Sequence, residues 1–204
     1  MLLTIYKNGS FYKKWGDQLS PYSFLIKFLF LFAFLYGLFP FMRGITSPDG
    51  KFYSSFVAEY VDIVKALTRF LTNAAKATLE LLQYETRQRD YQTLRIEHSR
   101  GIIVNPSCLG WGVMSFWTAF VVANKGVWQY KLKWLFMGLF FIMLLNTIRI
   151  ALVALANHLQ WHTVTSLDHH LVFNILSYCI IALMIAGFIR VQKKYEATAA
   201  QQSS

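Results

Sequence analysis

The sequence predicts an all-α, polytopic transmembrane helical bundle with about four membrane-spanning helices, and three observations support this fold class. Of the 204 residues, 55% are hydrophobic and 17% are aromatic. Only 15% are charged, against roughly 25% in an ordinary soluble domain. Four apolar stretches also approach the length of about 20 residues with which a helix crosses a bilayer. The length suits one integral membrane domain over residues 1–204.

The four expected membrane-spanning helices cover residues 22–42, 107–124, 133–156 and 171–189. The first follows a lysine-containing N-terminus, as in a signal peptide, but no small-residue cleavage site follows it, so we expect an uncleaved anchor. The second helix should begin near Ser107, because Pro106 suits a helix entrance. The third has no charged residue from 134 to 148 and is then interrupted by Arg149. The fourth is free of charge throughout.

Residues 43–106 have a different character and are expected to form an extracytoplasmic or interfacial segment. From 52 to 84 apolar residues alternate with six charged ones, a pattern that fits one or two amphipathic helices at the membrane surface. A membrane crossing with so many charges would be expensive. Residues 91–97 and 102–104, joined by a turn-like stretch at 98–101, resemble a small β-hairpin.

Basic residues predict the orientation. The connection after the second helix carries three lysines, the tail after the fourth helix carries three basic residues, and the loop 157–170 carries no Lys or Arg. Short-loop Lys and Arg counts decide topology, so both termini should be cytoplasmic at a cell (inner) membrane. The segment 43–106 is long enough to be translocated largely regardless of its charges.

The net charge of +10 is better explained by cytoplasmic anchoring of helices than by nucleic-acid binding. Nucleic acid needs basic residues clustered on a soluble face with aromatic residues placed to stack on bases. Here the aromatic residues lie inside uncharged runs, so no nucleic-acid partner is expected.

This topology brings three residues to one depth at the outer face. Cys108 and His170 each open a helix there, and Arg149 lies about 24 Å from Lys133 at the inner end of its helix, at 1.5 Å per residue. A Cys with a nearby His suits nucleophilic acyl transfer, in which the imidazole takes the thiol proton and the thiolate attacks a carbonyl. An arginine would stabilise the thiolate or the developing oxyanion. Cys179 lies about 13 Å deeper, too far to bridge Cys108, and should be a small core residue.

Each candidate also has a purely structural interpretation. Cys108 could be a packing residue, Arg149 an interfacial anchor and the histidines the lining of a polar loop. A charged residue inside an apolar helix is nevertheless a functional candidate by default. Asn146, three residues before Arg149, lies on the same helical face and could orient it. No histidine pattern has a recognised metal-ligand spacing, so no metal or other cofactor is expected.

At these residues the chain resembles the exosortase/archaeosortase family of membrane cysteine transpeptidases, in a short bacterial form. The resemblance rests on three ordered motifs: Asn105-Pro-Ser-Cys108-Leu-Gly110, Asn146-Thr-Ile-Arg149, and Asp168-His169-His170 at the head of a helix. It implies catalytic roles for Cys108, Arg149 and His170, with Asn146, Asp168 and His169 in support. Residues 94–190 carry the resemblance.

The resemblance also implies the partners. Substrates would be secreted proteins that end in a short C-terminal motif, a hydrophobic helix and a basic tail. Cleavage would pass through a thioester on Cys108 at the outer face, with Arg149 supporting the negative charge and His170 acting as base and then acid. Membrane lipid surrounds the enzyme, and water, an amine or a lipid-linked acceptor would release the product.

Two other function classes fit the composition. One is a non-enzymatic membrane scaffold or assembly subunit, in which Arg149 pairs with an acidic residue of a partner. The other is a small transporter that uses its histidines as a proton relay. The scaffold would tolerate loss of Cys108, and the transporter would depend more on Asp168 or a histidine than on the thiol.

Overall fold

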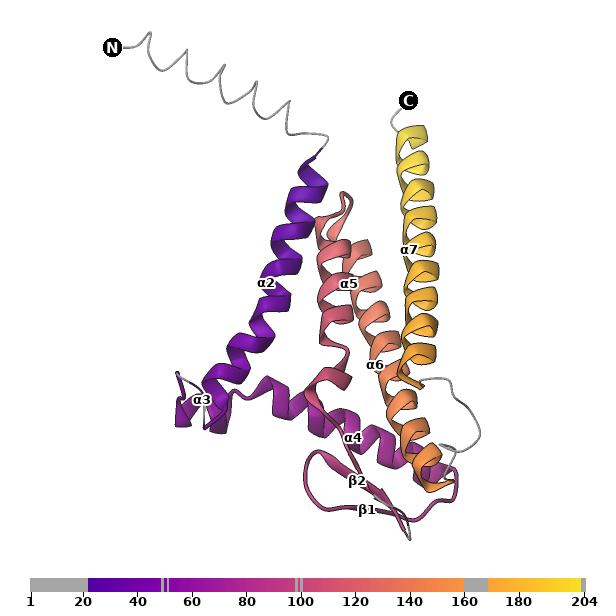
Figure 1. Ribbon diagram of the computed structural model, residues 1–204. Coiled ribbons are helices and arrows are strands. Elements are labelled where there is room, and N and C mark those ends of the chain that lie inside the picture. The colour runs from indigo at the N-terminus through magenta and orange to yellow at the C-terminus, as the bar shows by residue number, and fades with distance from the viewer. Residues whose placement is uncertain are drawn as a thin grey trace, which may run out of the picture.

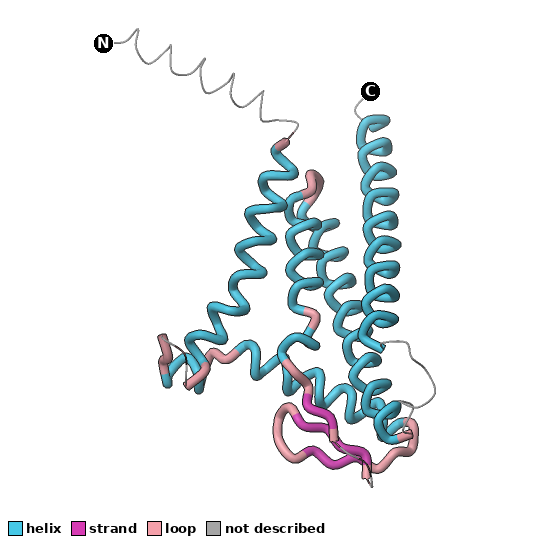
Figure 2. The backbone as a smooth tube through the Cα atoms, in the orientation of Figure 1, coloured by secondary structure: helices cyan, strands magenta, loops and turns pink. Residues whose placement is uncertain are grey.

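The computed structural model describes residues 22–48, 50, 52–97, 99, 101–159 and 169–202, with backbone alone at 107, 169–174 and 195–202. Four long or apolar helices run side by side, and a further helix crosses them at one end with a small sheet beyond it (Figures 1 and 2). Helix α2 begins and α7 ends at the opposite end of the bundle (Figure 1). We call the end that carries the sheet the outer end and the opposite one the inner end. The elements are α2 (Ser23–Thr46), α3 (Ser55–Tyr60), α4 (Ile63–Leu81), β1 (Thr86–Gln88), β2 (Thr93–Ile96), β3 (Ile102–Ile103), the 3-10 helix η1 (Pro106–Leu109), α5 (Trp111–Ala123), α6 (Trp128–His158) and α7 (His169–Gln202).

The helical bundle is confirmed. In the part of the chain that the structure describes, α2, α6 and residues Ile175–Lys194 of α7 are long and apolar enough to cross a membrane. Helices α2, α6 and α7 extend beyond the ranges expected at 22–42, 133–156 and 171–189. The second expected span, 107–124, is wrong in its start and length, because α5 has only 13 residues. At 1.5 Å per residue α5 is about 20 Å long, shorter than the roughly 30 Å hydrocarbon core of a bilayer.

Aromatic side chains join α5, α6 and α7 in the inner half of the bundle. The Trp117 ring lies over Gly138, where any side chain would collide with it. Its Nε1–H donates to the Trp134 carbonyl oxygen at 3.2 Å. The Tyr130 hydroxyl donates to the Phe188 carbonyl oxygen at 2.9 Å, and Phe188 is fully buried. Close van der Waals packing of this kind holds helices together in lipid, where the hydrophobic effect between them is absent.

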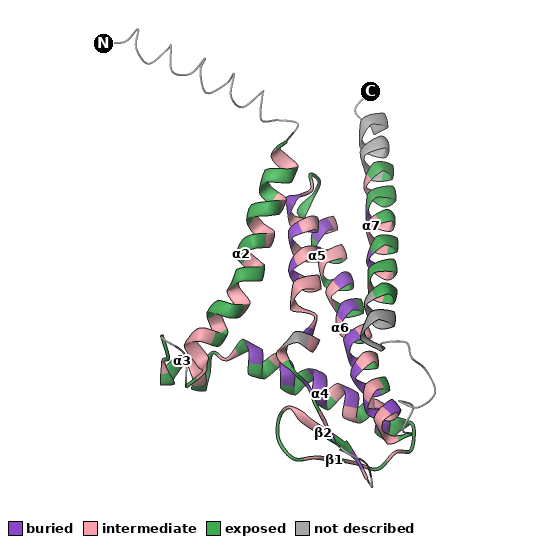
Figure 3. Cartoon of the chain, viewed as in Figure 1, coloured by how far each residue is buried: buried purple, intermediate pink, exposed green. Residues whose placement is uncertain are grey.

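Helix α2 packs on α5 through a column of rings. Phe28 stacks along α2 against Phe32, with ring centroids 5.9 Å apart, and both meet Phe116 edge to face. Trp111 Nε1–H donates to the Leu35 carbonyl oxygen at 2.9 Å. No residue of α2 is buried, so this helix presents much of its surface to the surroundings (Figure 3).

The amphipathic helix expected within 52–84 is confirmed as α4. The Asp62 carboxylate caps its first turn by accepting a hydrogen bond from Lys65 N–H at 2.8 Å. Buried positions recur along one face of α4 (Figure 3). That face packs on η1, the sheet and α6 in one core: Val64, Leu71, Ala75, Leu79, Leu94, Ile96, Val104, Leu109, Ile150, Ala151 and Ala154. The amphipathic pattern of α4 therefore reflects packing within the protein.

The expected β-hairpin is also confirmed. Strands β2 and β3 pair antiparallel with Thr93 opposite Ile103, and β2 alternates buried with partly or fully exposed positions. Strand β1 was not predicted from the sequence. It pairs antiparallel with β2 on its other side and completes the order β1-β2-β3. Between β1 and β2 the Asp90 carboxylate accepts hydrogen bonds from the backbone of Gln92 and Thr93. These bonds lower the pKa of Asp90 below its ordinary value.

Candidate functional site

Cys108 lies in a single 3-10 turn between the sheet and α5. Pro106 opens this turn, η1, and Cys108 N–H donates to the Asn105 carbonyl oxygen at 2.8 Å. Gly110 then adopts the left-handed conformation, with φ of 69°, and separates η1 from α5. The expectation that the second helix starts near Ser107 is therefore wrong. The chain breaks at Gly110, and the half-buried Cys108 precedes the helix instead of opening it.

Asn146 on α6 fixes this turn. Its side-chain Nδ2–H donates to the Leu109 carbonyl oxygen at 3.2 Å. The same amide lies against Gly110, and any side chain added at Gly110 would collide with it. Asn146 is 8% exposed, so its amide has little access to water as an alternative partner. The sequence suggested that Asn146 orients Arg149, whereas the Asn146 amide donates its hydrogen bond to the cysteine turn.

Arg149 lies one turn further along α6 toward the outer end. Residues three apart on a helix share a face, and the rise between Asn146 and Arg149 is about 4.5 Å. Arg149 is half-buried, and its neighbours Ile150 and Ala151 belong to the core that α6 forms with α4. The fold thus brings the turn that contains Cys108 to the part of α6 that contains Arg149. Their catalytic roles stay predictions.

The backbone of His170 lies in the first turn of α7, which begins at His169. This agrees with the expectation that a histidine opens the fourth helix. Asp168 lies outside the described residues, as do the side chains of His169 and His170. Ser177, which the sequence did not single out, borders a small cavity beside Asn146. Because Ser177 follows His170 by seven residues, the His170 backbone is about 10 Å further toward the outer end of α7.

An apolar crevice begins about one helical turn from the cysteine turn, on the side toward the inner end. It measures about 400 Å³ and is lined by residues of α2, α5 and α7: Phe32, Gly112, Val113, Phe116, Tyr178, Ile181, Ala182 and Ile185. Val113 and Ile181 also line the cavity of about 20 Å³ that reaches Asn146. A cavity of this size holds about one water molecule, for which Asn146 and Ser177 are suitable partners. The crevice and the site therefore adjoin each other.

Cys179 is a free thiol on an exposed part of α7. The expectation of a small core residue is wrong at this position. Burial varies along α7. Phe188, near the inner end, is buried among aromatic rings, whereas Tyr178 and Cys179 are exposed. A cysteine there has no packing role to lose, so it is a convenient position for substitution.

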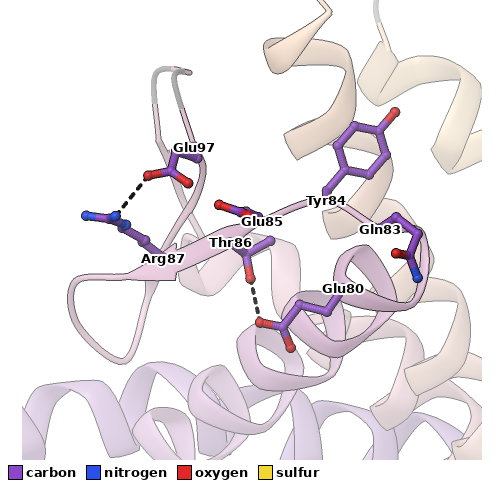
Figure 4. A pocket seen from close by; sticks show the side chains of 7 residues that line it. All are labelled: Glu80, Gln83, Tyr84, Glu85, Thr86, Arg87 and Glu97. Atoms are coloured by element: carbon purple, nitrogen blue, oxygen red, sulfur yellow. Dashed lines mark hydrogen bonds and ion pairs between the residues drawn. The ribbon is translucent and has the colours of Figure 1, made fainter.

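A polar hollow of about 470 Å³ lies at the outer end, where α4 meets the sheet (Figure 4). Arg87 and Glu97 form an ion pair at 2.8 Å across the sheet, and the Thr86 hydroxyl donates to Glu80 at 2.9 Å. The pair is largely exposed, so it adds little to stability. Among the described residues no group of three His, Cys, Asp or Glu side chains could hold a metal ion.

The chain matches no protein-family model, no curated protein and no solved structure. The resemblance to exosortases and archaeosortases therefore rests on the three sequence motifs alone, and membership of that family stays a prediction.

Proposed function

We propose that this chain is a membrane cysteine protease or transpeptidase that processes C-terminal sorting signals of secreted proteins through a thioester on Cys108. The observation that carries the proposal is the anchoring of the Cys108 turn by Asn146, one helical turn from Arg149. A nucleophile must be held in a fixed position to use its proximity to a substrate. Packing alone would not require a hydrogen-bonded turn and a left-handed glycine two residues after the cysteine.

The reaction follows from the residue types. The His170 imidazole takes the Cys108 proton, and the thiolate adds to the carbonyl carbon of the scissile peptide bond. Arg149 stabilises the negative charge that develops on the carbonyl oxygen. The C–N bond then breaks, the leaving amine takes the proton from His170, and the acyl group remains on sulfur. Water, an amine or a lipid-linked acceptor attacks the thioester and restores the thiol.

The apolar crevice supports a substrate that is itself in the membrane. Its volume of about 400 Å³ falls in the usual range for ligand sites. Its walls are helices α2 and α7 and its floor is α5, so an apolar helix could approach from the bilayer. The segment that leaves the membrane beside Gly112 would then pass Cys108, which precedes Gly112 by four residues.

The proposed location is the cell (inner) membrane, with the site on the outer side. Among the described residues, lysine and arginine outnumber acidic residues at the inner end, while six of the seven Asp and Glu residues lie between Glu59 and Glu97 and only Glu196 lies toward the inner end of α7. A thiol reagent that cannot cross membranes should label Cys108 in intact spheroplasts of a Cys179→Ala strain. A cysteine placed at Gln129 in a strain lacking both native cysteines should stay protected, and labelling there instead of at Cys108 would invert the orientation.

The function is tested by co-expression with a secreted reporter that ends in a candidate motif, a hydrophobic helix and a basic tail from the same genome. Cys108→Ala should abolish processing of the reporter while the protein still accumulates in the membrane. The matched variant Cys179→Ala should keep processing, because Cys179 is exposed and lines neither the crevice nor the cavity beside Asn146. A scaffold would tolerate both changes. Normal processing by Cys108→Ala would rule out the thioester.

A further inference from the structure

Aromatic side chains around the short helix α3 form an exposed apolar face. Phe52, Phe56 and Tyr60 are 77%, 66% and 70% exposed. The rings of Phe56 and Tyr60, one helical turn apart, lie 5.1 Å from each other. We call these three side chains the α3 face. Large exposed apolar patches on a protein mark surfaces that contact a partner or a membrane.

The chain turns sharply after α2 and returns α3 to its outer end. Gly50 packs against the backbone of Gly44, where any side chain at Gly50 would collide with the Gly44 carbonyl oxygen. Ser54 N–H, just before α3, then donates to the Ile45 carbonyl oxygen at 3.0 Å. These contacts fix the start of α3 beside the last turn of α2 (Figure 1).

The depth of that last turn follows from the charges of α2. Lys27 and Arg43, both exposed, bracket a run without charged residues. They are sixteen residues apart in the sequence, which corresponds to about 24 Å along the helix. Their long side chains can reach the two headgroup layers from these positions. Ile45 and the start of α3 therefore stand at the level of the outer headgroups if α2 crosses the bilayer.

Helix α4 differs from α3 in what covers its apolar face. The apolar residues on the core face of α4, namely Val64, Leu71, Ala75 and Leu79, are buried against η1, the sheet and α6, so they are not available to lipid. Ile63, Phe70 and Leu81 of the same helix stay exposed. No residue of α3 is buried. Helix α3 therefore differs from α4 in having no apolar face committed to the core, and its Phe56 and Tyr60 rings contact each other at the surface.

We propose that the α3 face lies in the headgroup region of the outer leaflet and anchors the outer layer of the protein to the bilayer surface. Phe and Tyr rings at the end of a membrane-spanning helix match the amphipathic character of that region. Because α3 leads directly into α4, and α4 packs on η1, this anchor would also hold the cysteine turn at the surface. The inference goes beyond the proposed function and does not depend on catalysis.

Spin labels test the proposal in the full chain. In a background of Cys108→Ala and Cys179→Ala, a cysteine replaces Phe56, Tyr60 or, as a matched control, Leu81 at the far end of α4, which is 82% exposed. The protein is reconstituted in vesicles of phosphatidylethanolamine and phosphatidylglycerol. Labels at 56 and 60 should collide with dissolved oxygen more often than with a water-soluble nickel chelate, and the label at 81 should show the reverse.

Two results would overturn the proposal. One is chelate access at both 56 and 60 equal to that at 81, which would place the α3 face in water. The other is spin–spin broadening at 56 and 60 that disappears on dilution with unlabelled protein, which would make the face a contact between copies of the chain. Two label positions guard against a local disturbance by either substitution, since both side chains are exposed and neither fills a core.

Discussion

The Asn146 amide on α6 donates a hydrogen bond to the Leu109 carbonyl oxygen at 3.2 Å and so joins the third long helix to the turn that contains Cys108. This bond makes the position of a local turn depend on a helix distant in sequence. Asn146, the first residue of the Asn-x-x-Arg motif, therefore stabilises the cysteine turn, which is a different role from the one proposed for Arg149.

Asn146→Ala should misplace the cysteine turn. The change leaves the buried Leu109 carbonyl without its donor, at a cost of about 1–3 kcal/mol. Processing of a reporter should fall about tenfold or more, the rate equivalent of ~1.4 kcal/mol, and the rate of Cys108 alkylation by a maleimide should change with it. Thr147→Ala is the control, because the Thr147 hydroxyl bonds within α6 to Met143. Equal processing by both variants would mean that the Asn146 bond does not position the site.

Gly110→Ala should be more damaging than substitution of a glycine that has open space around it. An alanine would be strained by about 1–2 kcal/mol at the φ of 69° found there, and its methyl group would collide with Asn146. We expect a lower melting temperature in detergent and loss of processing. Gly37→Ala on α2 is the comparison, because nothing lies within 4 Å of a Cβ at that position. A Gly110→Ala protein as stable and active as Gly37→Ala would contradict the geometry of the turn.

Filling the crevice should block a membrane-anchored substrate. Ala182 lines the crevice, so Ala182→Trp should place an indole in the space between α2, α5 and α7 and reduce processing. Its neighbour Leu183 is 73% exposed, and Leu183→Trp should retain processing at matched expression. The assay compares the two variants by measuring reporter cleavage in membranes as a change in the size of the reporter. Full activity of the Ala182→Trp protein would remove the crevice from the substrate path.

The two adjacent histidines should differ in importance. Neighbours on a helix point about 100° apart, so His169 and His170 cannot both face Cys108. A general base contributes about 10²- to 10⁴-fold, and His170→Ala should lower processing by that order, while His169→Ala should cost much less. The assay is reporter cleavage at equal membrane levels of the two variants. An inactive His169→Ala protein with an active His170→Ala protein would reverse the assignment.

Much of the fold could be predicted because its signals are local. The apolar runs mark the long helices, and the alternation of buried Leu94 and Ile96 with exposed Arg95 marks the hairpin strand. Strand β1 could not be found in this way, because Thr86, Arg87 and Gln88 carry no apolar pattern.

The site was harder to predict because its geometry depends on tertiary contacts. Nothing near Gly110 in the sequence indicates that Asn146 will occupy the space where a side chain would be. Pro106 was a correct sign of a helix entrance, but the helix it opens is a single 3-10 turn. Similarly, the periodicity of α4 predicted an apolar face without telling whether lipid or protein covers it, and η1, the sheet and α6 cover it.

The most direct test of the central claim is intact-mass spectrometry of the Cys179→Ala protein isolated rapidly from membranes that also contain the reporter. We expect an adduct of the reporter fragment on Cys108. Hydroxylamine should remove it, as expected for a thioester, and it should be absent from the Cys108→Ala, Cys179→Ala protein. The adduct should accumulate when release is slower than acylation, and quenching in acid during active processing should preserve it. If the protein without Cys108 cleaves the reporter as well as the Cys179→Ala protein does, the reaction does not pass through a thioester on Cys108.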